Sequence, residues 1–205
     1  DVCTGDGIEP GDVLDLLDRL VQQSIVVVDN HGAHARYRLL ETIRQFGLDQ
    51  LRQRGAHAEF RARHAAYFNR CAEEGARESF GSREQHWLEW ARTELPNLRA
   101  AMDYGISEAD RETDTGVDTG LDTGLDTGLD SGVDSGTDTA IDTGAAAHQS
   151  LKTAVSLAHL RIWFFLESPT EGRFWLEKIL GRASDVDHSL RVTAMALAGW
   201  ISLCQ

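Results

Sequence analysis

The chain has 205 residues, and 41% of them are hydrophobic, which is enough to bury a core in one or two domains. Its net charge is −13, but residues 110–146 hold nine Asp and Glu112 against Arg111 and carry −9, which leaves −4 for the rest. A near-neutral body with an acidic insert lacks the basic face that a dedicated nucleic-acid binder needs to neutralise phosphates.

The first predicted element is an amphipathic helix over residues 11–23. Its apolar residues recur every three or four positions, as one buried helix face requires. A β-branched run over residues 25–29 and a second stretch over 35–40 predict two antiparallel strands, with a turn at 30–32 between them. The apolar face of the helix consists of Val13, Leu14, Leu17, Leu20 and Val21.

Helical spacing returns over residues 42–54, and Gly55 is the expected C-terminal stop of that helix. The order helix, hairpin, helix is that of the C-terminal part of a winged-helix subdomain, which we place at residues 1–56. Beyond it the β signal disappears, and a mainly α chain is predicted.

The next two predicted helical regions cover residues 60–71 and 87–102. Pro96 lies inside the second region and cannot donate to the preceding turn, so a break or kink is expected near Glu94 and Leu95. After the acidic insert, helical spacing predicts three further helices, over residues 151–166, 171–180 and 190–203.

The insert is a tetrapeptide repeat, mostly Asp-Thr-Gly-Val/Leu, with Asp at every fourth position from 110 to 142. In a helix these carboxylates would line one face and repel one another, and each recurrent Gly costs roughly 1 kcal/mol. A solvated acidic linker over residues 109–147 is therefore predicted. Calcium binding is the alternative, because Asp and Gly can supply ligands and turns, but neither the β-roll nonapeptide nor the EF-hand loop is present.

The common motifs of catalysis and cofactor binding are missing from the sequence. There is no Gly-x-x-x-x-Gly-Lys-Ser/Thr phosphate loop, no His-Glu-x-x-His and no Gly-x-Ser-x-Gly. His57, His64 and Cys71 share a seven-residue spacing, for which packing beside neighbouring aromatic residues is a better account than a metal site. We expect no enzyme activity and no catalytic, cofactor-binding or metal-binding residue in this chain.

Cysteine usage and hydropathy favour a cytoplasmic chain without membrane contact. Cys3, Cys71 and Cys204 are far apart, so neither a disulfide framework nor a thiolate zinc site is predicted. The longest apolar runs are much shorter than the roughly 18 to 20 residues that span a bilayer. The N-terminus does not resemble a signal peptide, and the missing initiator Met suggests a chain cut from a longer one.

Arginines in the hairpin and the helix after it are the candidate binding residues. We predict that Arg36, Arg38 and Arg44 contact a phosphate or another domain, and the alternative is that they pair with neighbouring carboxylates. Direct reading of DNA by the helix at residues 11–23 is not favoured, because phosphates repel its acidic side chains. That helix carries Asp12, Asp15 and Asp18 against Arg19.

Four strings of the sequence carry a family resemblance. They are LLDRLVQQSIV at residues 16–26, RYRLLETIRQF at 36–46, ELPNLRAA at 94–101 and EGRFWLE at 171–177. In this order they resemble the winged-helix and helical-repeat region of bacterial STAND-type (NB-ARC-like) regulatory ATPases, many of which are LuxR-type or adenylate-cyclase-linked transcriptional regulators.

The resemblance implies that the chain is a fragment. In the family an ATPase core with the phosphate loop precedes the winged helix, so ATP or ADP would bind to the parent chain, and this segment holds no cofactor. A helical connector is implied over residues 57–108, and the start of a tetratricopeptide-like repeat region over 148–205. Relatives often place a Met-His-Asp triplet, whose His touches the nucleotide, where this chain has Leu39-Leu40-Glu41, and Leu40 cannot donate that hydrogen bond.

The predicted function is that of a non-catalytic segment in signal transduction and transcription regulation. It would couple the nucleotide state of the ATPase core to a repeat region that senses a protein partner or a small signal, and it would act on DNA only indirectly. The alternatives are a stand-alone winged-helix DNA-binding protein, and a protein-interaction scaffold without a nucleotide link.

Overall fold

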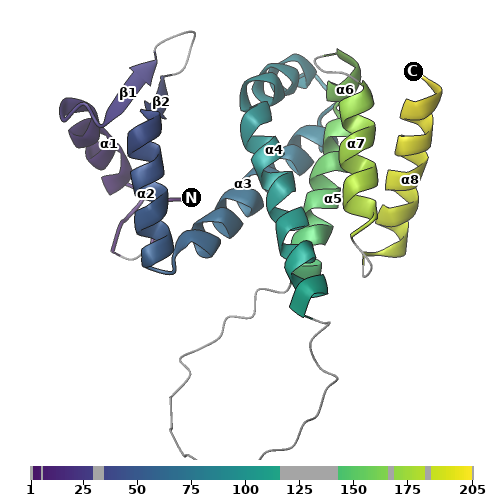
Figure 1. The fold of residues 1–205 in the computed structure, drawn as a ribbon. Helices are drawn as coiled ribbons and strands as arrows, with labels where there is room; N and C mark the ends of the chain where they lie inside the picture. The colour runs from purple at the N-terminus through teal and green to yellow at the C-terminus, as the bar shows by residue number, and fades with distance from the viewer. Residues whose placement is uncertain are drawn as a thin grey trace, which may run out of the picture. The chain divides into compact units, whose positions relative to one another are not determined.

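A computed structural model describes residues 2–5, 7–29, 35–115, 143–165, 169–182 and 186–204. The chain is mainly helical with a short antiparallel hairpin, which confirms the predicted fold class (Figure 1). It divides into two compact units, residues 1–67 (unit 1) and 68–205 (unit 2). No helix in the described ranges is both long and apolar enough to cross a membrane.

Unit 1 has the predicted order of helix, hairpin and helix. The elements are α1 Asp12–Gln22, β1 Val26–Asp29, β2 Arg36–Leu39, α2 Glu41–Gln53 and the first part of α3 His57–Arg77. Its first four elements begin and end within one residue of the predicted bounds, whereas α3 begins three residues before and ends six residues after the predicted range 60–71. The predicted turn at 30–32 lies outside the described residues.

The core of unit 1 is thin. Val26 is buried at the end of the hairpin opposite the turn, but none of the residues of α1 is fully buried. Leu17 and Leu20 are half-buried as members of the predicted apolar face, whereas Leu14 of the same face is 67% exposed, so its predicted place in the core is wrong. The physical reason is angular: a helix that rests on a two-stranded hairpin buries a narrower stripe than the apolar spacing allows.

Unit 2 contains the rest of α3 and five further helices. These are α4 Glu84–Thr115, α5 Thr143–His159, α6 Ile162–Phe165, α7 Pro169–Leu180 and α8 His188–Leu203. Helix α4 packs along α5, and α7 packs against both α5 and α8, so that four long helices stand side by side (Figure 1). Their shared interior holds the fully buried side chains of Leu98, Met102, Leu151, Leu157, Trp163, Leu176, Ile179 and Ile201.

Helix α4 runs through Pro96 without a break, so the break that was one of the two alternatives expected near Glu94 and Leu95 is absent. A proline inside a helix removes one backbone donor. The side chains of Leu95 and Leu98 on either side of it are buried in the core of unit 2, and this packing holds the helix continuous.

The helices next to the acidic insert are longer than predicted. Helix α4 continues to Thr115 and α5 begins at Thr143, so both ends of the predicted linker at 109–147 are helical, while residues 116–142 lie outside the described residues. Burial of Ala146 and Ala147 explains the early start of α5. The finer division into a connector over 57–108 and a repeat region over 148–205 stays a prediction.

Candidate functional site

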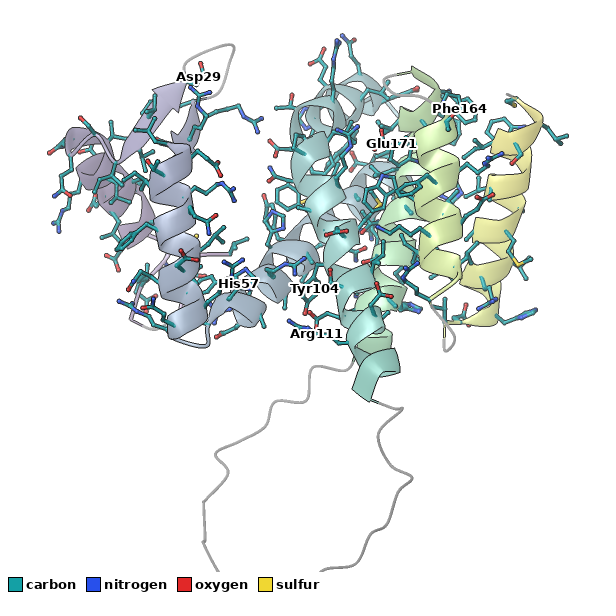
Figure 2. All side chains as sticks on the ribbon, in the orientation of Figure 1. Asp29, His57, Tyr104, Arg111, Phe164 and Glu171 are labelled. Atoms are coloured by element: carbon teal, nitrogen blue, oxygen red, sulfur yellow. The ribbon has the colours of Figure 1, made fainter. Side chains whose placement is uncertain are left out.

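The two hairpin arginines lie on one face of the sheet. The register pairs Arg36 with Asp29 and Arg38 with Val27, and directly paired residues of antiparallel strands share a face. The opposite face is apolar and consists of Val26, Val28, Tyr37 and Leu39. All four residues of β2 are exposed, and Asp29 lies at the end of β1 (Figure 2). The structure therefore presents an exposed basic face that carries a single carboxylate in its described part.

Arg44 occupies a different setting, in the first turns of α2. Its Nε donates to Glu41 Oε2 at 2.8 Å and its Nη2 to Oε1 at 2.5 Å. The hydrogen bond from Arg44 holds the pKa of Glu41 below its ordinary value, and the same bond raises the pKa of Arg44. Both side chains are exposed, so the pair contributes little stability. For Arg44 the structure thus shows the alternative given above, pairing with a neighbouring carboxylate. A phosphate or interdomain contact by Arg36, Arg38 and Arg44 stays a prediction.

Helix α1 keeps the acidic surface expected from the sequence. Asp12, Asp15 and Asp18 are all exposed. Asp12 Oδ2 accepts from the backbone N–H of Glu9 at 2.9 Å, and Asp18 Oδ2 accepts from Gln22 at 2.6 Å. An acidic helix of this kind does not enter a DNA groove readily.

Metal-ligating side chains do not cluster in the part of the chain that the structure describes. No group of three or more His, Cys, Asp or Glu residues there has the geometry to hold an ion. Cys3, Cys71 and Cys204 form no disulfide within the described residues, and the first and last of them are exposed.

A bidentate ion pair joins α4 to α7 in unit 2 and was not predicted. Arg99 Nε and Nη2 each donate to the carboxylate of Glu171 at 2.7 Å, and the indole N–H of Trp175 donates to Glu171 at 3.0 Å (Figure 2). Two further ion pairs involve α4: Asp103 pairs with Lys178 of α7 at 3.7 Å, and Asp110 pairs with Arg182, just after α7, at 2.6 Å. Arg99 and Glu171 lie 72 positions apart, so the pair cannot be predicted from local sequence spacing.

The Glu171 contact predicts an acid-sensitive stability. The hydrogen bond from Arg99 is the main reason why the pKa of Glu171 lies below its ordinary value of 4.5, and burial opposes it. A lowered folded-state pKa stabilises the fold above the unfolded pKa, and this contribution is lost as the pH falls through the folded value. We expect the unfolding free energy of wild type to approach that of Glu171→Gln below about pH 4.5.

Urea unfolding between pH 7 and pH 3 measures this difference. The matched control is Glu177→Gln, because Glu177 pairs with Arg173 on the exposed side of the same helix. A difference between wild type and Glu171→Gln that stays constant over the whole pH range would contradict the prediction.

A shallow hollow in unit 2 was also missed. It lies between α3 and α5, has a volume of about 290 Å³, and is lined by Glu73, Ala76, Arg77, Ser156 and His159. On each helix the lining residues follow spacings of three and four, which is the only signal that the sequence offers. That signal does not tell which two helices meet.

Comparison with known proteins finds relatives of half the chain. Three proteins described as HTH-type transcriptional regulators, one from Mycobacterium bovis and two from strains of Mycobacterium tuberculosis, are each 39% identical to it over 100 residues. The matched stretch makes up 49% of this chain and 11% of each relative, so about half of the chain corresponds to a small part of much longer proteins. No protein-family model and no solved structure matches the chain.

Proposed function

We propose that this chain is a non-catalytic regulatory segment of a transcriptional regulator. The observation that carries the proposal is the 39% identity over 100 residues to HTH-type regulators, of which the matched stretch forms 11%. A stretch of that size is one module among several. In the finer form of the proposal, residues 1–56 are the winged-helix arm of a STAND-type regulator, residues 57–108 its helical connector, and residues 148–205 the start of its tetratricopeptide-like sensor.

The surface of unit 1 supports contact with another part of such a regulator. Leu14, Leu40 and Phe46 are 67%, 52% and 64% exposed. A partner that covered these side chains would remove their apolar surface from water. The ATPase core implied by the family resemblance is the proposed partner, and its nucleotide state would bias the packing of this arm.

A second candidate is direct DNA binding through the hairpin. The relatives' description as HTH-type regulators supports this candidate more directly than it supports an ATPase link. The exposed basic face with Arg36 and Arg38 is the specific observation in its favour. The acidic surface of α1 speaks against it, because phosphates would be repelled there.

Titration of a labelled 30-base-pair duplex with the full chain separates the two candidates. We expect no saturable rise in fluorescence anisotropy at low salt, because α1 and the overall charge of −13 oppose the approach of DNA. Saturable binding that falls with salt would overturn the regulatory candidate in favour of DNA binding.

In that case the double variant Arg36→Ala/Arg38→Ala should reduce the salt dependence by about two counterions. The matched control is Arg52→Ala, since Arg52 is an exposed arginine of the same unit that pairs with Asp49. An equal loss in the control would mean that the hairpin face is not the contact.

A further inference from the structure

Beside the hollow, a network of hydrogen bonds between polar side chains links α3 and α5. Thr153 Oγ1 donates to Asn69 Oδ1 at 2.7 Å, and Asn69 Nδ2 donates to Glu73 Oε1 at 2.9 Å and also to Gln149. Asn69 and Thr153 are both buried. Buried polar groups that satisfy one another hold their neighbours in one arrangement, so the walls of the hollow are preformed.

Ser156 supplies a hydroxyl to this hollow. Its side chain is 6% exposed and lines the hollow, yet its Oγ makes no hydrogen bond to any residue that the structure describes. A helical Ser or Thr normally bonds the carbonyl four residues back. Thr93, Ser107, Thr193 and Ser202 all make that bond. Ser156 Oγ is not among the buried unpartnered atoms of the described residues, so the oxygen faces the open hollow, where a ligand can accept its hydrogen bond.

Arg77 and His159 add two further donors beside this hydroxyl. Arg77 Nε donates to the backbone oxygen of Glu73 at 3.3 Å, and its terminal nitrogens bond to no described residue. The carboxylate of Glu73 also lines the hollow, where it accepts from Asn69 and lies 3.8 Å from Lys152 Nζ. The lining thus offers a permanent positive charge, a hydroxyl and an imidazole.

We propose that this hollow binds a small ligand through an oxyanion, a carboxylate or a phosphate group. Arg77 and Ser156 donate to its oxygens, and a ring N–H of His159 supplies a third hydrogen bond. The volume of about 290 Å³ is at the lower end of small-molecule sites, so the ligand has few heavy atoms. Charged donors around a preformed cavity are the usual means of orienting such a ligand.

A ligand in this hollow would be a signal for the proposed regulatory segment. Only this signalling role rests on the proposed function. Its α3 wall belongs to unit 2, but α3 continues across the division between Tyr67 and Phe68 into unit 1. A ligand held by Arg77 therefore contacts the helix that both units share. Binding itself is measured without DNA or a partner, so its failure leaves the proposed regulatory role untouched.

The test records ¹H–¹⁵N spectra of the full chain during separate titrations with inorganic phosphate and with succinate, against sodium chloride of matched ionic strength. We expect saturating shifts at the amides of Arg77, Ser156 and His159 with at least one of the two anions. Saturation by phosphate alone identifies a phosphate ligand, and saturation by succinate alone a carboxylate. Shifts that match those in chloride would overturn the proposal.

Two variants tie the binding to the hollow. Arg77→Gln and Ser156→Ala should each weaken the affinity by about tenfold, because each removes a hydrogen bond to a charged group. Ser156→Ala keeps a good helix former at a buried position, and its spectrum reports whether it folds. The matched control is Arg173→Gln, an exposed arginine of α7 away from the lining. Equal affinity in all three variants would overturn the site.

Discussion

Replacing Trp163 with Ala is expected to lower the free energy of unfolding of unit 2 by about 3 to 5 kcal/mol. Trp163 lies in the short helix α6 and is 0% exposed. A Cβ built on Gly172 would lie 2.5 Å from Cγ of its ring, so the indole rests directly on the backbone of α7. Removing the ring leaves a cavity that a helix backbone cannot fill.

Urea unfolding followed by circular dichroism measures this loss. Phe174→Ala is the matched control, because Phe174 is an aromatic residue of α7 that is half exposed. Trp163→Phe should lose much less than Trp163→Ala, since the buried indole N–H finds no acceptor among the described residues. The prediction fails if Trp163→Ala costs no more than the Phe174 control.

Gly105→Ala is expected to destabilise unit 2 by about 3 kcal/mol, although alanine is the better helix former. The new Cβ would lie 2.0 Å from Ser150 Oγ and 2.4 Å from the backbone oxygen of Ala146. The hydroxyl can rotate away, but the backbone oxygen can move only with helix α5. Helices α4 and α5 must therefore separate along a closely packed interface.

Gly199→Ala is expected to change the stability of unit 2 in the opposite direction from Gly105→Ala. Nothing lies within 4 Å of a Cβ at Gly199 in α8, so alanine should stabilise that helix by about 1 kcal/mol. Thermal melts of both variants, compared with wild type, test the pair. A rise in melting temperature for Gly105→Ala like that for Gly199→Ala would show that α4 and α5 do not meet as closely as described.

Local spacing was sufficient for most of the secondary structure. The apolar period over residues 11–23 predicted α1, and the β-branched run before Asn30 predicted β1, because both patterns repeat within a few residues. The same local information placed Arg36 and Arg38 in one strand. Their common face follows from the alternation of side chains along a strand.

Local spacing failed wherever burial decided the outcome. Pro96 argued for a break, but the burial of Leu95 and Leu98 keeps α4 intact. Leu14 has the spacing of a core residue and lies exposed, because no element of unit 1 covers it in the described residues. Local sequence patterns are easily overridden by tertiary packing. At Pro96 packing preserves a helix that the sequence would break, and at Leu14 it leaves exposed a residue that the sequence would bury.

The sequence by itself determined the order of the elements, the acidic character of α1 and the insert, and the presence of arginines in the hairpin. Each of these features depends only on residues that are neighbours in the chain. Only the tertiary structure decided that Arg99 meets Glu171, that Trp163 lies on Gly172, and that Arg77 and Ser156 share a hollow. These partners are about 10 to 80 residues apart in the chain. Which helices pack together depends on the burial of whole faces, and that information is not contained in any local window.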